Sequence, residues 1–224
     1  MTGGWLRPAV FGVTDGLVSN TALLAGVAGG LHGGGDSGHT LVITGLAGLV
    51  AGAFSMATGE YVSVASQVEL TRAEIEVEKA EIARAPEAEQ AELAAVYRSR
   101  GVDAEVAAEV ARQLSRDPEQ AWRVHAREEL GVDPDDLPSP WIAAASSLGA
   151  FAIGALMPLL PYLLGAGSLL VPVLLAGLGL FAAGALVSRF TNRSVVYTGA
   201  RQLLLGGAAA TLTYLIGRVV GAAV

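Results

Sequence analysis

The sequence has no cysteine, and it has few of the other residues on which protein sites commonly depend. The absence of cysteine excludes disulfides, thiolate zinc sites and cysteine nucleophiles. Three histidines, His32, His39 and His125, leave little room for a histidine-rich metal site. Charged residues make up only 16% of the chain and hydrophobic residues 52%, which is too apolar for a soluble globule or a disordered chain. We therefore expect a protein that lies largely in a membrane.

The few charges are concentrated in one segment. Residues 68–138 hold 18 of the 21 acidic residues and nine of the 14 basic ones, a net charge of −9. The remaining chain has three acidic and five basic residues, a net charge of +2. This division predicts transmembrane helices in residues 1–67 and 139–224, with an acidic soluble insert in residues 68–138. The orientation and the ligand pattern described below make this insert the expected cytosolic metal-binding domain.

Five apolar stretches are long enough to cross a bilayer, which takes about 20 residues of α-helix. They are residues 9–31, 40–66, 141–164, 167–187 and 199–220. The sequence thus predicts an all-α fold, a five-span transmembrane helical bundle with a helical insert between the second and third spans.

The basic residues predict an orientation, because Lys and Arg are enriched in cytoplasmic loops. Arg7 precedes the first span, nine basic residues lie in the insert, and three surround the connection between the fourth and fifth spans. This pattern predicts a cytosolic N-terminus, a cytosolic insert and an external loop that contains Asp36. The lack of a targeting segment favours a multi-pass protein of the bacterial plasma membrane.

Glycines four residues apart predict close helix packing, since small residues let membrane helices approach one another. The pairs are Gly12 and Gly16, Gly26 and Gly30, Gly48 and Gly52, and Gly217 and Gly221. Five helices enclose little space, so a homodimer with a pathway between its subunits is favoured.

Polar residues inside the spans mark a candidate transport pathway. Asp15 lies in the first span, where a carboxylate is costly and is by default functional. Ser19 follows one turn later on the same face, and Asn20 is adjacent. In the second span, Met56 and Glu60 are one turn apart, and a thioether with a carboxylate suits a borderline ion such as Fe²⁺. The alternatives are that Asp15 caps or snorkels at the interface and that Met56 only packs.

The insert is predicted to be helical, and the second span should continue into it because neither Gly nor Pro interrupts the chain between Gly59 and Pro86. Two later helices are predicted to begin near Asp103, a candidate N-cap, and around Asp117 and Pro118. Carboxylates recur at helical spacing, together with one imidazole. The candidate metal ligands are Glu74, Glu78, Glu81, Glu89, Glu92, His125 and Glu129. Such a set suits Mg²⁺, Mn²⁺ or Fe²⁺, and a solvated acidic face is the alternative.

With these residues in place, the chain resembles the vacuolar iron transporter family of plants, fungi and bacteria along essentially its whole length. The matching segments are residues 15–20, 51–61, 127–131 and 158–162. The resemblance implies a five-span homodimer that moves Fe²⁺, and often Mn²⁺, out of the cytosol, with proton exchange as the driving force. It also implies a pathway between the subunits and a cytosolic helical domain that binds metal through glutamates.

The resemblance assigns roles to particular residues. Asp15 and Met56 match the pathway carboxylate and thioether. The glutamates that match the cytosolic metal site are Glu78, Glu81, Glu89, Glu92 and Glu129. His125 stands near the place of paired methionines in the plant proteins and is the substitute ligand. Gly48 stands where the plant pathway has an acidic residue, and Glu60 is the candidate to supply that charge.

These observations predict a membrane transporter that moves Fe²⁺ and Mn²⁺ out of the cytosol in exchange for protons. Its expected partners are divalent metal ions, protons, the lipid bilayer and a second copy of the chain, with no nucleic acid. The metal is the transported ion rather than a permanently bound cofactor. The alternative is a non-transporting membrane metal sensor or iron-storage scaffold, which leaves Asp15 without a role. An enzyme is disfavoured because the sequence shows no nucleophile–base pair and no hydrolase or nucleotide motif.

Overall fold

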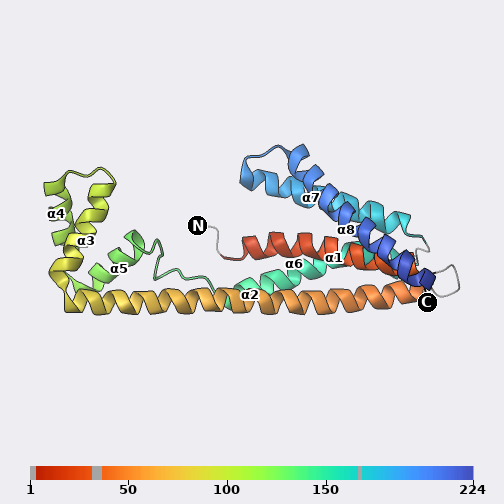
Figure 1. The fold of residues 1–224 in the computed structure, drawn as a ribbon, viewed down its shortest axis with the longest axis horizontal. Coiled ribbons are helices and arrows are strands. Elements are labelled where there is room, and N and C mark those ends of the chain that lie inside the picture. Colours follow the sequence, from red (N-terminus) through yellow and green to blue (C-terminus); the bar gives the residue numbers. More distant parts are fainter. Residues whose placement is uncertain (1–3, 32–36, 166–167, 224) are drawn as a thin grey trace. The chain divides into compact units, whose positions relative to one another are not determined.

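The computed structural model describes residues 4–31, 37–165 and 168–223, and within these ranges the chain is entirely helical, without strands (Figure 1). The helices are α1 (Leu6–Gly30), α2 (Ser37–Arg84), α3 (Pro86–Ser99), α4 (Ala104–Leu114), α5 (Pro118–Glu128), α6 (Pro140–Leu163), α7 (Leu170–Thr191) and α8 (Val195–Ala223). Two features expected from the sequence, Asp36 in an external loop and the start of the fourth span at residue 167, lie outside the described residues.

Five of these helices, α1, α2, α6, α7 and α8, are long and apolar enough to cross a membrane. The predicted all-helical chain with five candidate spans is thereby confirmed. The described chain divides into two compact units, Met1–Val62 with Pro140–Val224, and Ser63–Ser139. The helix α2 belongs to both, because no Gly or Pro interrupts it between Gly59 and Pro86. Its 48 residues exceed the roughly 20 that a bilayer requires.

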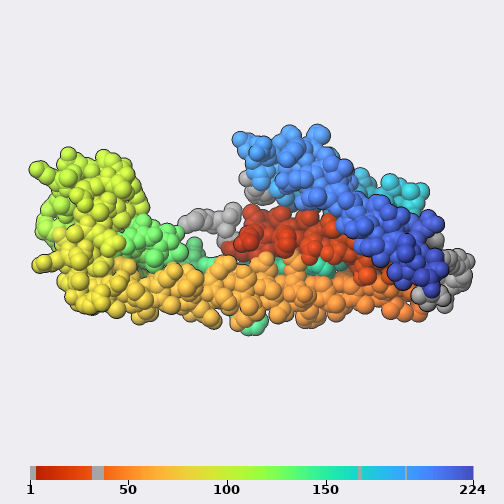
Figure 2. Space-filling view, viewed as in Figure 1, coloured from red at the N-terminus to blue at the C-terminus, as the bar shows by residue number. Residues whose placement is uncertain are grey.

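In the first unit, α1 makes its most extensive contacts with α6 and α8. Glycines allow this approach. A methyl group at Gly16 would overlap the Phe151 carbonyl oxygen of α6, and one at Gly154 would overlap the Val13 carbonyl oxygen of α1. At the other crossing, a methyl group at Gly217 would overlap the Gly26 carbonyl oxygen. Figure 2 shows the dark-blue surface of α8 directly against the red surface of α1.

Two small apolar clusters attach α2 to this core. Leu41 of α2 packs with Leu24 of α1 and Tyr162 of α6. Further along α2, Ala53 packs with Phe151 and Ala155 of α6. These contacts fix the face of α2 that is turned toward α1 and α6.

The outer faces of the first unit are strongly apolar. Leu204 and Val219 of α8 are 73% and 71% exposed, and Leu178 of α7 is 69% exposed. Apolar surface of this extent is typical of a region that contacts lipid or another subunit.

In the second unit, the predicted helix starts near Asp103 and Asp117 are confirmed. Pro86 begins α3, where its fixed φ and missing N–H are tolerated. The side chains of Asp103 and Asp117 accept hydrogen bonds from the backbone N–H groups of Glu105 and Glu119, both at 3.0 Å, and so cap α4 and α5. Buried Leu93, Ala94 and Ala111 form the apolar centre between α3 and α4.

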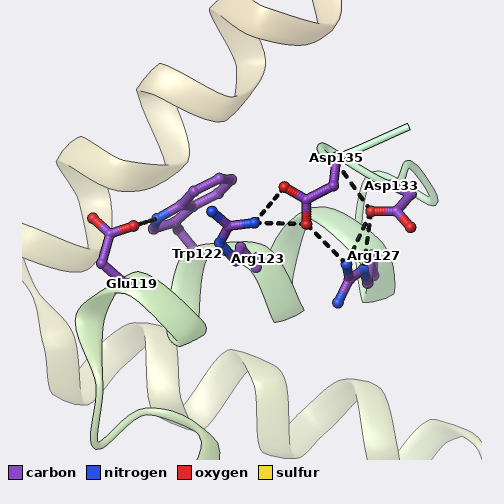
Figure 3. A network of polar contacts seen from close by, with 6 residues as sticks. All are labelled: Glu119, Trp122, Arg123, Arg127, Asp133 and Asp135. Atoms are coloured by element: carbon purple, nitrogen blue, oxygen red, sulfur yellow. Dashed lines mark hydrogen bonds and ion pairs between the residues drawn. The ribbon is translucent and has the colours of Figure 1, made fainter. Parts of the chain in front are cut away.

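Ion pairs hold the segment that follows α5 against that helix (Figure 3). Arg127 donates to Asp133 Oδ1 at 2.9 Å, and Arg123 donates to Asp135 Oδ2 at 2.6 Å. On the other side of Arg123 lies the Trp122 ring, whose centre is 4.3 Å from Lys79 Nζ of α2. The two arginines therefore fix residues 133–135 against α5, and the Trp122 ring links α5 to α2.

Candidate functional site

A cavity of about 220 Å³ lies in the first unit between α1, α2 and α6. Its polar lining comes from Asp15, Ser19 and Asn20 of α1 and from Ser55 and Met56 of α2. The structure therefore brings together four of the five residues that the sequence assigned to a pathway. Glu60, the fifth, is half-buried and does not line this cavity.

Asp15 and Ser19 form a local pair on α1. The Ser19 hydroxyl donates a hydrogen bond of 2.8 Å to Asp15 Oδ1. A spacing of four residues puts them on one helix face, so this contact follows from the sequence. The bond orients the carboxylate and leaves its remaining lone pairs available to a cation.

The wall opposite Asp15 is built from α2. Met56 is half-buried and packs against the cluster of Ala53, Phe151 and Ala155, so its thioether is held beside the cavity. At Gly52, a methyl group would overlap the Phe151 ring. Ser55 also lines the cavity. Sequence reasoning missed it, and the available signal was a hydroxyl directly before the singled-out methionine.

This donor set is chemically specific. A carboxylate, hydroxyls, an amide and a thioether combine hard oxygen ligands with one soft sulfur ligand, which suits a borderline divalent cation such as Fe²⁺. The cavity is too small for a sizeable organic ligand, for which pockets of about 300–1,000 Å³ are usual.

A second group of candidate ligands surrounds His125 in the other unit. His125 Nδ1 lies 2.8 Å from Glu78 Oε1 and 3.0 Å from Glu129 Oε1. The imidazole is 1% exposed, yet neither contact has the geometry of a hydrogen bond. Glu89 completes a set with Glu78 and His125 whose ligand atoms lie within 4.8 Å of one another. Three helices thus direct ligand atoms toward one point.

The other predicted ligands differ in how they relate to this cluster. Glu81 and Glu92 are close enough to interact electrostatically with Glu78, and Glu92 also interacts with Glu129. Glu74 is exposed and lies outside the set of converging ligand atoms among the described residues. The helical turn that Glu74 shares with Glu78 therefore does not bring both carboxylates to the imidazole.

The cluster is electrostatically crowded. Burial raises the pKa of Glu129 above its ordinary value, and the nearby charges of Glu78, Glu92 and Glu89 raise it further, while His125 acts in the opposite direction. Carboxylates brought together in a partly buried space repel one another, and a divalent cation relieves that repulsion.

Glu128, the neighbour of Glu129, has a different role that sequence reasoning missed. Its carboxylate accepts hydrogen bonds from the Tyr97 hydroxyl, at 3.3 Å, and from the Arg100 guanidinium. These contacts tie the end of α5 to α3 and so position Glu129 and His125. The available signal was that successive residues of a helix lie about 100° apart, so Glu128 and Glu129 cannot both face His125.

The comparisons with known proteins identify the chain. A model of the VIT family matches residues 6–218. The chain belongs to this family. A relative named "Vacuolar iron transporter" from Acanthamoeba castellanii is 38% identical over 217 residues, covering 93% of this chain and 76% of the relative.

Plant members of the VIT family are similar over the same extent. "Vacuolar iron transporter 1" of Arabidopsis thaliana is 29% identical, with 96% of this chain and 86% of the relative covered. "Vacuolar iron transporter homolog 1" of Oryza sativa subsp. japonica is 32% identical, with 97% and 74% covered. The VIT-family match spans both compact units, so the cavity and the His125 cluster both lie inside it. The resemblance drawn from the sequence is thereby confirmed.

Proposed function

We propose that this chain is a membrane transporter that moves Fe²⁺, and also Mn²⁺, out of the cytosol in exchange for protons. The observation that carries the proposal is the cavity in which Asp15 and Met56 meet between membrane-length helices. The names of the similar proteins, two vacuolar iron transporters and one vacuolar iron transporter homolog, support iron as the substrate. This function is transport and not an enzymatic reaction.

The His125 cluster is the proposed collecting site. Its unit lies in the segment that carries a net charge of −9, which attracts cations from solution. Glu78, Glu89 and His125 offer two carboxylates and an imidazole, the ligand types that Mn²⁺ and Fe²⁺ accept. Glu81, Glu92 and Glu129 add negative charge around them.

The cavity is the proposed site on the translocation pathway. Asp15 supplies the charge that binds the ion, and Met56 supplies the soft ligand. Proton exchange requires a membrane carboxylate that alternates between proton and metal, and Asp15 is the carboxylate that lines the cavity. Glu60, also in a span, is proposed as a second proton-binding residue along the route.

The proposed assembly is a homodimer with the N-terminus and residues 68–138 in the cytosol. The exposed apolar faces of the first unit and the distribution of Lys and Arg support it. The membrane proposed is a bacterial plasma membrane. This location rests on the sequence alone, and the similar proteins with vacuolar names come from eukaryotes.

Flux into proteoliposomes tests the function. Wild-type protein should carry Fe²⁺ across the bilayer, and an opposing proton gradient should accelerate it. Asp15→Asn should lower the initial rate by about tenfold to a hundredfold, the loss that follows disruption of a metal site. Thr14→Val is the matched control, because the adjacent Thr14 hydroxyl bonds only the Val10 carbonyl of its own helix and does not line the cavity.

The same experiment separates the transporter from a metal sensor or storage scaffold. A sensor or scaffold binds Fe²⁺ but gives no flux above that of empty liposomes. If Asp15→Asn keeps the wild-type flux, the protein is still a transporter, but Asp15 is not part of its pathway.

A further inference from the structure

The amide of Asn20 is bonded at one end only. Its side chain is 2% exposed, and Nδ2 donates a hydrogen bond of 2.7 Å to the Ala155 carbonyl oxygen of α6. Only the amide nitrogen can face a carbonyl oxygen, because two acceptors repel each other. The contact with α6 therefore fixes which way the amide points.

The amide oxygen is consequently directed away from Ala155. Oδ1 is buried and has no hydrogen-bond partner among the described residues, and Asn20 lines the same cavity as Asp15 and Met56. Gly48 of α2 faces this oxygen, since a methyl group at Gly48 would lie 2.8 Å from Oδ1. No side chain at position 48 covers the oxygen, which is itself buried in the lining of the cavity.

An unpaired amide oxygen in a buried site is unfavourable unless something binds it. The hydroxyl donors in the cavity lining are Ser19 and Ser55, and the Ser19 hydroxyl already donates to Asp15. An amide carbonyl oxygen is a neutral, hard ligand of the kind that divalent cations such as Ca²⁺, Mg²⁺ and Mn²⁺ accept. The cavity thus has a third ligand atom besides the carboxylate and the thioether.

We propose that Asn20 coordinates the transported cation through Oδ1 and sets the preference between harder and softer divalent ions. This inference rests on the proposed transport function and adds to it a specificity-determining residue. A neutral ligand holds the ion without adding a second negative charge beside Asp15. Ion conduction requires binding that is favourable enough for entry and weak enough for release, and a neutral oxygen meets both requirements.

The test measures initial rates of Mn²⁺ and Fe²⁺ uptake against concentration in proteoliposomes. Asn20→Ala removes the oxygen, so the KM for Mn²⁺ should rise by about tenfold, while Fe²⁺, which the Met56 thioether also binds, should lose less. Gly48→Ala should change the Mn²⁺-to-Fe²⁺ ratio in the same direction. Its methyl group would lie 2.8 Å from Oδ1 and would overlap Leu23 Cδ2, so the end of the Leu23 side chain must shift while the methyl group covers the oxygen.

Thr21→Val is the matched control. Thr21 is also buried on α1, but its hydroxyl bonds the Leu17 carbonyl of the same helix and does not line the cavity. This variant should keep the wild-type KM for both ions. Folding of each variant is checked by size-exclusion chromatography and circular dichroism.

The outcomes separate the two proposals. If the wild-type protein carries neither ion, the transport function itself fails. If the wild type transports but Asn20→Ala and Gly48→Ala keep its KM values and ion ratio, the role of Asn20 is overturned. Equal loss for both ions in Asn20→Ala, with normal behaviour of Gly48→Ala, would show a packing role and would also overturn it. If Asn20→Ala does not fold, Gly48→Ala decides.

Discussion

His125 Nδ1 on α5 lies 2.8 Å from Glu78 Oε1 on α2, although α3 and α4 separate the two helices in the chain. The carboxylate of Glu129 approaches the same nitrogen at 3.0 Å. Two carboxylates thus approach one imidazole nitrogen without forming a hydrogen bond to it. This nitrogen marks the point at which the ligand atoms converge. This relationship is the basis for the predictions about the second unit.

Glu78→Gln should weaken Mn²⁺ binding by about tenfold or more, because the amide removes one of the charges that face His125. The measurement is calorimetry on the full-length protein in detergent, in an Asp15→Asn background so that the cavity contributes less. Glu74→Gln, one turn earlier and exposed, is the matched control and should keep the affinity. Equal losses in both variants would mean that the acidic face attracts ions without a defined site.

The stability of the metal-free protein should depend on pH through Glu129. Its pKa is raised by burial and by neighbouring carboxylates. A carboxyl group with a folded pKa above its unfolded value contributes stability that is present below the unfolded pKa and is lost as the pH rises through the folded pKa. Glu129→Gln cannot ionise, so its thermal stability relative to wild type should increase as the pH rises from about 5 to about 8.

Differential scanning fluorimetry in the presence of a chelator measures this effect, and Trp122 reports from the unit that contains Glu129. Glu87→Gln is a suitable control because Glu87 is an exposed carboxylate of the same unit outside the cluster. If the melting temperatures of Glu129→Gln and wild type differ by the same amount at every pH, the raised pKa assigned to Glu129 is wrong.

Gly154→Ala should destabilise the first unit by about 1–3 kcal/mol or more, because the new methyl group overlaps the Val13 carbonyl oxygen, which belongs to rigid backbone. Gly149→Ala on the same helix is the control, since a methyl group there meets nothing within 4 Å. Thermal unfolding in detergent compares the two variants. If both are tolerated equally, α1 and α6 are not packed through Gly154.

Glu128→Gln should destabilise the second unit by about 1 kcal/mol, since it weakens the bonds from Tyr97 and Arg100 that hold the end of α5. It should also lower Mn²⁺ affinity by displacing Glu129 and His125, although Glu128 is not itself among the converging ligands. Arg98→Gln, an exposed charge change on the same helix as Tyr97, should alter neither property. Unchanged affinity in Glu128→Gln would mean that α5 is held by its apolar contacts alone.

Local signals predicted much of the fold correctly. Helix starts are marked by Pro86, Asp103 and Asp117. The first backbone N–H groups of a helix have no acceptor within the helix, so an aspartate side chain can accept from them, and a proline has no N–H to satisfy. Side-chain pairs within one helix were also predictable. The spacing of Asp15 and Ser19, and of His125 and Glu129, places each pair on one helix face.

Contacts between helices were not predictable from such spacing. The helical period places Glu74 and Glu78 on one face of α2, but of the two only Glu78 meets His125 of α5. Ser55, Glu128 and the bond from Asn20 to Ala155 depend in the same way on how neighbouring helices are rotated and brought together.

The sequence by itself determined the membrane-length helices, the acidic segment, the residue types for a divalent cation and the resemblance to the family. These depend on composition and on periodicity along one helix, which are local properties. Only the tertiary structure decided that Asn20 bonds Ala155 and lines the cavity of Asp15 and Met56 with its amide oxygen unpaired, and that Glu78 rather than Glu74 reaches His125. The first follows from close packing, because the glycines of α1, α2 and α6 set how near these helices come and therefore which polar atoms meet. The second depends on where α5 meets α2 in the other unit.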